Sequence, residues 1–284
     1  MIIDSFPYFN EKELLELRIN LLKDYVDKFI IIDANRTHQG KVKPFTCKNT
    51  IKELGLNCDK IQVIELDLSW ADNETNCWLR EKSQRNEVYK YIHDDDYCII
   101  SDCDEIIRPD LIQNAISIVN TDEETILLLP MYHLLYQANM ISPSEWYVGY
   151  MAKGSTIKKV TASYYRHKIS WVGGKHAKDF DFTILHLMTV DGSLCGWHFS
   201  WMGDNMRRKI KNESFANHGD SIEDMNKTIL SFTPEIGKPS LFKTTSINNS
   251  GVITSENDLK EFDTSLLPKI IWDLPRVKEF LLPN

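Results

Sequence analysis

The stretch Tyr97-Cys98-Ile99-Ile100-Ser101-Asp102-Cys103-Asp104-Glu105 is an apolar run that ends abruptly in three carboxylates within four residues. Asp102 and Asp104 are two residues apart, so on a continuing strand their side chains would point the same way. Two carboxylates held close together repel each other unless a cation lies between them, and Mg²⁺ or Mn²⁺ typically bridges such carboxylates to substrate phosphates. The stretch therefore predicts a strand that ends at a metal-diphosphate site. The alternative is an acidic turn that caps a helix starting at Pro109.

The segment before this strand has the spacing of an amphipathic helix, because apolar residues recur with a helical period across 78–92. Arg80 and Arg85 lie on this predicted helix, and a guanidinium fork suits the phosphate oxygens of a nucleotide. For Arg80 alone, pairing with an acid on a solvated helix face is the favoured interpretation.

The first part of the chain alternates strands and helices, which favours an α/β fold with a mainly parallel sheet and helices on both faces. Continuous apolar runs such as 29–32 are typical of strands buried on both faces, and a nucleotide binds at the carboxyl ends of such strands. The predicted strands are 1–4, 28–33, 61–66 and 97–101, and the predicted helices are 11–24, 47–55, 76–92 and 109–119.

From about residue 121 the pattern becomes mixed. The sequence predicts a strand at 125–130, an aromatic-rich segment at 132–150, a helix at 155–166, strands at 182–188 and 195–201, a loop-rich region at 217–258 and a closing helix at 268–282.

Composition indicates a compact globular protein. Of the 284 residues, 42% are hydrophobic and 26% charged, and the net charge of −8 argues against binding to nucleic acid or to anionic membranes. Six cysteines without a C-x-x-C pair favour buried reduced thiols. There is neither a signal segment nor an apolar run of the ~18 residues that a membrane span requires, so we expect a cytoplasmic protein.

Several separated motifs, in order, resemble glycosyltransferase family 17. They are Ile2-Ile3-Asp4-Ser5-Phe6-Pro7-Tyr8-Phe9-Asn10-Glu11, Glu13-Leu14-Leu15-Glu16-Leu17-Arg18, the segments 26–37 and 40–44, the helix with Arg85-Asn86, the Asp-x-Asp of Asp102 and Asp104, and Gly196-Trp197-His198-Phe199-Ser200-Trp201. The resemblance covers most of residues 1–220. That family includes enzymes that add bisecting N-acetylglucosamine to the β-mannose of glycoproteins.

The resemblance implies a single catalytic domain of GT-A fold over 1–284. Residues 1–120 would form its Rossmann-like, nucleotide-sugar-binding half, and residues 121–284 a mixed acceptor-side half with a C-terminal segment. The implied reaction is an inverting, metal-dependent transfer of a sugar from a nucleotide sugar to a hydroxyl of an acceptor glycan. N-acetylglucosamine from its UDP donor is the favoured sugar, and Mn²⁺ or Mg²⁺ is the implied cofactor.

The resemblance also implies roles for individual residues. Asp104 and His198 would bind the metal, and Asp102 would reach it through water or hold the donor ribose. For His198, a core histidine hydrogen-bonded to a carbonyl is the alternative. The residues implied in binding the nucleotide sugar are Ser5, Asn35, Arg36, Arg85, Asp102, Lys211 and His218.

The catalytic base is predicted to be Asp220, within His218-Gly219-Asp220. The basic segment 207–211, which precedes it, would clamp the diphosphate as negative charge builds on it, although any one of its side chains also fits a solvated helix face. Asp179, Asp181, Asp191 and Asp204 remain candidates for the base.

Two other functional classes stay open at this stage. A haloacid-dehalogenase-like phosphohydrolase also has Asp-x-Asp at a strand end, but it expects Thr or Val where this chain has Ile106. A non-catalytic glycan-binding protein on a transferase fold is the other class, and the intact Asp102, Asp104 and His198 argue against it.

Overall fold

The computed structural model describes residues 1–73, 75, 77–159, 161–166, 182–200, 202, 243–247 and 253–282, with the backbone alone for 243–247 and 253–258. The predicted site residues Lys211, His218 and Asp220 lie outside the described residues, as do Asp179, Asp181 and Asp204.

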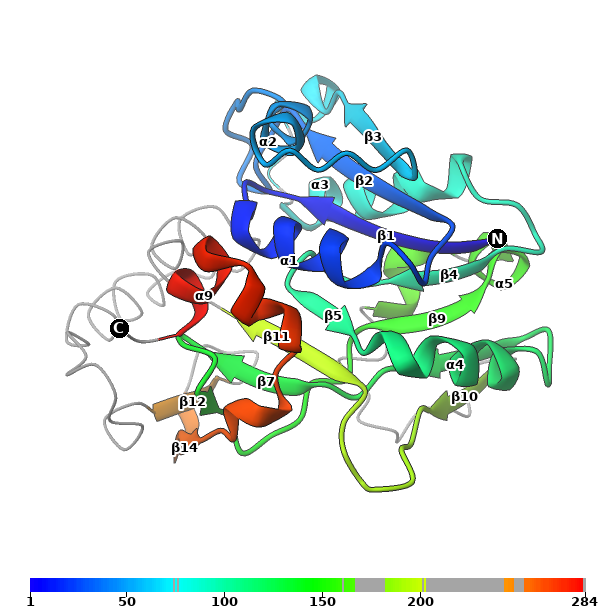
Figure 1. Ribbon diagram of the computed structural model, residues 1–284. Helices are drawn as coiled ribbons and strands as arrows, with labels where there is room; N and C mark the ends of the chain where they lie inside the picture. The colour runs from blue at the N-terminus through cyan, green and yellow to red at the C-terminus, as the bar shows by residue number, and fades with distance from the viewer. Residues whose placement is uncertain are drawn as a thin grey trace.

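The larger sheet has seven strands, and four of its six neighbouring pairs are parallel. Strand β9 is antiparallel to both of its neighbours. In spatial order the strands are β10 (Thr183–His186), β6 (Thr125–Leu128), β9 (Tyr150–Lys153), β4 (Tyr97–Ile100), β1 (Ile2–Tyr8), β2 (Lys28–Ala34) and β3 (Ile61–Leu66). The predicted mainly parallel α/β arrangement is confirmed (Figure 1).

Helices cover both faces of this sheet because its central strands are apolar on both sides. Ile31 of β2 belongs to one hydrophobic cluster together with residues of α1, α4 and α9, whereas Ile30 and Ile32 belong to a second cluster beside α5. Among the described residues, the helices are α1 (Lys12–Leu22), α2 (Cys47–Glu53), α3 (Cys77–Asn86), α4 (Ile112–Val119), α5 (Gly154–Lys159) and α9 (Pro275–Leu281). Residues 162–166 are also helical, and 3-10 turns lie at Ser69–Ala71, Glu87–Lys90, Pro109–Leu111, Thr264–Leu266 and Lys269–Asp273.

A second sheet of five strands lies beside the first (Figure 1). Gly196 permits the close approach of its strands, because a Cβ atom there would lie 2.3 Å from the carbonyl oxygen of Ile106. In spatial order the strands are β14 (Lys260–Glu261), β8 (Met140–Ile141), β7 (Tyr132–Leu135), β11 (Gly196–Ser200) and β5 (Glu105–Ile107), and β12 (Lys243–Ile247) pairs with β13 (Ile253–Asp258) as a separate hairpin.

The predicted elements of the first half are confirmed, with some different ends. Strand β1 runs on to Tyr8, and the helix predicted at 76–92 ends as a 3-10 turn. The closing helix predicted at 268–282 is divided into a 3-10 turn and α9, which begins at Pro275. The helix predicted at 155–166 is also divided, into two helical pieces. The prediction of a loop-rich region at 217–258 is wrong for β12 and β13.

No helix within the described ranges combines the length and apolar character needed to cross a membrane.

Candidate active site

The carboxylate stretch forms a turn that connects the two sheets. Strand β4 ends at Ile100, and β5 begins at Glu105 in the other sheet. The predicted strand ends at the carboxylates as expected, and Asp102 and Asp104 do not share the side-chain alternation of a continuing strand, because residues 101–104 form a turn at the carboxyl end of β4. This is the edge of a parallel sheet at which α/β proteins bind ligands.

Arg18 of α1 fixes the backbone of this turn by hydrogen bonds. Its guanidinium group donates to the carbonyl oxygens of Asp102 at 2.6 Å and Glu105 at 2.8 Å, and to the hydroxyl of Ser101 at 2.6 Å. The same group forms a fork with the carboxylate of Asp4, at 2.8 and 2.6 Å. Because the one buried guanidinium group of Arg18 donates hydrogen bonds to several oxygens of the turn, the turn is held rigidly.

Asp102 lies between two arginines. Arg85 Nη1 donates to Asp102 Oδ1 at 2.7 Å, and Arg166 Nη2 contacts Asp102 Oδ2. Arg85 comes from α3 and Arg166 from the helical residues 162–166, so parts of the chain far apart in sequence meet on this carboxylate. Burial alone would lower the pKa of Arg166, but the charges of Asp102 and Glu105 outweigh it and raise that pKa.

Glu105 is fully buried and accepts four hydrogen bonds. Arg166 donates to both of its carboxylate oxygens at 2.7 Å. The indole N–H of Trp146 donates to Oε1 at 2.6 Å, and the backbone N–H of Asp102 donates to Oε2 at 2.8 Å. Since two carboxylate oxygens offer about four lone-pair sites, the acceptor capacity of Glu105 is filled.

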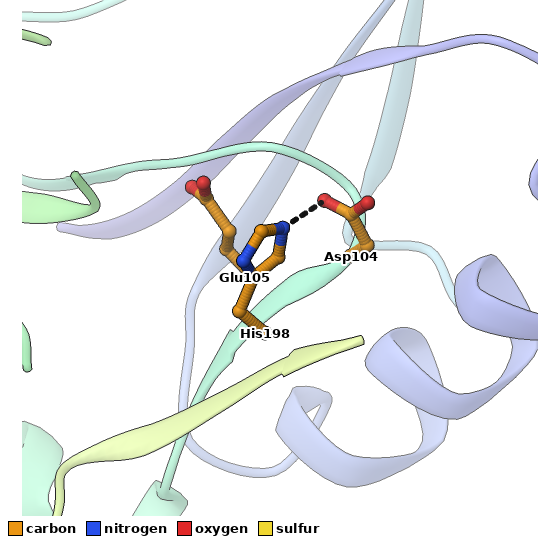
Figure 2. A group of neighbouring side chains, drawn as sticks. All are labelled: Asp104, Glu105 and His198. Carbon is orange, nitrogen blue, oxygen red and sulfur yellow. Dashed lines mark ion pairs between the residues drawn. The ribbon is translucent and has the colours of Figure 1, made fainter. Parts of the chain in front are cut away.

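Asp104 faces His198 across the pair of strands β5 and β11. Nε2 of His198 lies 3.7 Å from Oδ1 of Asp104, as Figure 2 shows by a dashed line, and both side chains are 7% exposed. The backbone N–H of Phe199 donates to the carbonyl oxygen of Asp104 at 2.8 Å, which fixes the register of the two residues.

Two aromatic side chains pack against His198. The ring of His133 stacks on it, with centroids 5.0 Å apart and planes at 10°, and Trp146 lies 4.3 Å away. Burial, with a smaller contribution from His198, lowers the pKa of His133 to about 3. His133 is therefore neutral near pH 7, and His198 is held in one orientation by its neighbours.

The donor atoms suit a small divalent cation. One ligand atom each from Asp104, Glu105 and His198 lies within 4.8 Å of the others. Ligands of an octahedral Mg²⁺, each about 2.1 Å from the ion, are about 3 Å apart when adjacent and about 4 Å apart when opposite. The 3.7 Å between Asp104 and His198 falls in this range. Carboxylate oxygen and imidazole nitrogen are also ligands of Mn²⁺. Glu105, whose oxygens are already filled, is better described as an anchor of the turn.

The predicted donor-binding residues that the structure describes lie beside the carboxyl ends of β2 and β4. Ser5 is buried on β1 and pairs in register with Ile100, the last residue of β4. Asn35 donates to Asp67 at 2.7 Å and accepts from the backbone N–H of Leu68 at 2.8 Å. These contacts connect the end of β2 to the segment after β3.

Two arginines of this region have contacts that sequence spacing did not reveal. Arg36 forms a fork with Asp72, at 2.5 and 2.9 Å. Arg80 was expected on a solvated face, and this is wrong: it is buried and donates to the carbonyl oxygens of His38 and Ala71, both at 2.8 Å. Arg80 thus joins the segments that follow β2 and β3.

Asp191 is the candidate base that the structure describes. It lies in the connection from β10 to β11, is exposed, and accepts a hydrogen bond from Ser193 Oγ at 2.6 Å. Hydrogen bonds from Ser193 lower its pKa to about 2. Gly196, three residues after Ser193, pairs with Ile107, whereas His198 pairs with Glu105. Asp191 therefore lies toward the opposite end of this strand pair from Asp104.

The family profile of glycosyltransferase family 17 matches residues 1–226. The chain belongs to this family. The family 17 match begins at β1, ends beyond β11, and includes the turn with Asp104 and the strand with His198. Membership makes the chain an enzyme of glycosyl transfer with a GT-A fold, acting on a nucleotide sugar and a glycan acceptor, and it favours this class over a phosphohydrolase.

Several solved structures resemble this family 17 chain at low identity. 4-diphosphocytidyl-2C-methyl-D-erythritol synthase from Anaerococcus prevotii is 9% identical, with a TM-score of 0.40 over 68% of this chain and 91% of its own. S. aureus TarS is 14% identical, with a TM-score of 0.40 over 82% and 72%. The galactosyltransferase LgtC, in complex with donor and acceptor sugar analogues, is 11% identical, with a TM-score of 0.33 over 66% and 73%. At these scores the likenesses carry no functional argument. No curated protein matches the sequence.

Proposed function

We propose that this family 17 enzyme is an inverting, metal-dependent transferase that moves N-acetylglucosamine from UDP-N-acetylglucosamine to a hydroxyl of an acceptor glycan. The observation that carries the proposal is the pairing of Asp104 with His198 at the carboxyl end of β4, on a turn that Arg18 holds in place.

Asp104 and His198 are the proposed protein ligands of Mn²⁺ or Mg²⁺, with Asp102 reaching the ion through water or holding the donor ribose. A bound divalent cation supplies positive charge that stabilises the leaving diphosphate. The protein contributes a fixed ligand pair: Asp104 is held by its backbone bond to β11, and His198 by its packing against His133 and Trp146.

The nucleotide sugar is proposed to lie along the carboxyl ends of β1, β2 and β4. A guanidinium fork suits the diphosphate, and Arg85 lies beside Asp102 at this edge. The residues proposed to bind the donor are Ser5, Asn35, Arg36, Arg85, Asp102, Lys211 and His218.

Inversion needs a carboxylate that takes the proton of the acceptor hydroxyl as the new bond to the anomeric carbon forms. Asp220 is the proposed base. The bond between the anomeric carbon and the diphosphate oxygen breaks, UDP leaves with the bonding electrons, and the hydroxyl proton passes to the carboxylate of the base.

Isothermal titration of UDP with and without Mn²⁺ tests the metal-dependent donor site. We expect tight binding only with the ion, and loss of this dependence in Asp104→Asn. Asp110→Asn, a change of the same size at an exposed residue on the far side of β5, is the matched control. Equal UDP affinity in all conditions would contradict the metal site. A hydrolysis screen of nucleotide sugars then identifies the donor: the largest rate with another sugar would contradict N-acetylglucosamine.

A further inference from the structure

Two buried arginines converge on one carboxylate of the turn. The side chains of Arg85 and Arg166 are 4% and 8% exposed, whereas that of Asp102 is 33% exposed. Charges this far from water are weakly screened, so the two ion pairs hold Asp102 more firmly than surface pairs would.

Arg166 also forms hydrogen bonds with the neighbouring carboxylate, that of Glu105. Its two terminal nitrogens each donate to an oxygen of Glu105, and Trp146 and the backbone of Asp102 fill the remaining positions. A cation that enters the turn would therefore have to displace a guanidinium group before it could reach Glu105.

The arginines also reduce the negative charge that attracts a cation. Among the described side chains, Asp102, Asp104, Glu105 and Glu81, which pairs with Arg85 at 3.4 Å, carry four negative charges. Arg85 and Arg166 carry two positive charges, which leaves a net charge of −2. Mg²⁺-like ions usually need one or two carboxylates and the oxygens of substrate phosphates. With Asp102 and Glu105 held by arginine, the turn presents Asp104, together with His198, to the ion.

We propose that Arg85 and Arg166 make metal binding depend on the nucleotide. By holding Asp102 and Glu105, they keep the affinity for the bare ion low, and the ion binds well only when a nucleoside diphosphate brings further oxygen ligands. Arg166 is then a positioning residue that acts through the two carboxylates. This inference rests on the metal-dependent donor site proposed above.

The proposal predicts changes of opposite sign, which a purely structural role would not produce. Removing Arg166 or Arg85 adds net negative charge and takes one arginine away from Asp102, so the affinity for the ion alone should rise. The coupling between ion and nucleotide should fall, and by linkage the ion and UDP strengthen each other by the same factor. A variant that had simply lost structure would instead bind both the ion and UDP more weakly.

The experiment titrates Mn²⁺ in the absence and presence of UDP and follows the free ion by electron paramagnetic resonance. For the wild-type protein we expect UDP to tighten Mn²⁺ binding by at least about tenfold, within the usual range of such couplings. For Arg166→Gln, we expect Mn²⁺ alone to bind about tenfold more tightly, as expected when a positive charge leaves a poorly screened site, with a smaller coupling factor. Arg108→Gln, which removes a partly exposed arginine paired with Asp110, is the control and should leave both values unchanged.

If Arg166→Gln does not unfold cooperatively, and so is not properly folded, Arg85→Gln tests the same proposal. It releases one oxygen of Asp102 but leaves the buried pair of Arg166 and Glu105 intact, and it too should tighten Mn²⁺ alone. Unchanged or weaker binding of Mn²⁺ alone in the folded variant would overturn the inference. Wild-type protein that binds no Mn²⁺ even with UDP would instead remove the proposed metal site, so the two failures are distinguishable.

Discussion

The guanidinium group of Arg18 and the carboxylate of Asp4 form a two-pronged ion pair in which both side chains are fully buried beneath the turn. The ring of Phe6 lies 4.3 Å from the same guanidinium carbon. The pair therefore couples α1 and β1 to the backbone that carries Asp102 and Asp104.

Arg18→Met should destabilise the protein by about 3–5 kcal/mol, because it leaves the Asp4 carboxylate buried and unpaired. Urea unfolding measures this loss. The double variant Arg18→Met/Asp4→Leu removes both charges and should be clearly more stable than the single variant. If the double variant is no more stable, the loss comes from the bonds of Arg18 to the turn and not from an unpaired Asp4 carboxylate.

His198→Ala should weaken binding of Mn²⁺ and UDP less than Asp104→Ala does, because water can replace one neutral ligand more easily than a charged one. Titration calorimetry at limiting Mn²⁺ compares the two variants. His133→Ala, which removes the neighbouring ring, is the control for lost packing. Wild-type affinity in His198→Ala would make His198 a packing residue.

Arg85→Ala should cost about 1.5–3 kcal/mol of UDP-sugar affinity at saturating Mn²⁺, the usual effect of losing a hydrogen bond to a charged group. Arg85→Lys should not restore it, because an ammonium group lacks the planar fork. Equilibrium binding of the donor gives the answer. Full affinity in Arg85→Lys would show that charge alone is required.

The depressed pKa of His133 predicts a pH-dependent stability. Between its folded-state pKa of about 3 and an unfolded value near 6.5, the unfolded chain binds more protons at this residue, so its contribution is fully present above pH 6.5 and is lost as the pH falls. Between pH 7.5 and 5 the loss is at most about 2 kcal/mol. Urea unfolding in chelator should show that His133→Phe loses less stability over this interval than the wild type. The same pH dependence in both proteins would contradict the depressed pKa.

Asp220→Asn should leave donor binding intact while transfer falls by about 10²–10⁴-fold, the usual contribution of a positioned base. Single-turnover transfer and UDP titration measure the two effects separately. Asp191→Asn is the matched control and should retain activity, since Asp191 lies toward the far end of the β5–β11 pair. The opposite result would move the role of base to Asp191.

The sequence predicted the larger sheet well because its signals are local. The apolar runs at Phe29–Ile32 and Tyr97–Ile100 each occupy a short stretch of sequence, and the structure has strands β2 and β4 at these positions. The predicted pairing of Asp104 with His198 rested on the family resemblance, and the structure brings the two side chains together.

The partners that hold the site escaped sequence analysis because they are local only in space. Arg166 is 61 residues from Glu105, and Trp146 is 41 residues from it. No periodicity connects such residues. Arg80 was misassigned for a related reason: a helical arginine looks alike whether its fork meets solvent or two buried carbonyl groups. Ile106 and Ile107 follow the carboxylates directly, and nothing in their sequence indicates that the chain passes here from the larger sheet to the smaller one.

The small sheet separates two environments, because successive residues of a strand face opposite sides. His133 and His198 stack on one side, while their neighbours Tyr132 and Trp197 meet the C-terminal segment, through Phe262 at 5.0 Å and the Leu266 carbonyl at 3.0 Å. This segment lies beyond the residues that the family profile matches. The C-terminal segment nevertheless packs against strands β7 and β11, which carry His133 and His198. A substitution in this segment thus acts on the proposed metal ligand His198 through the strands, without changing any residue of the proposed site.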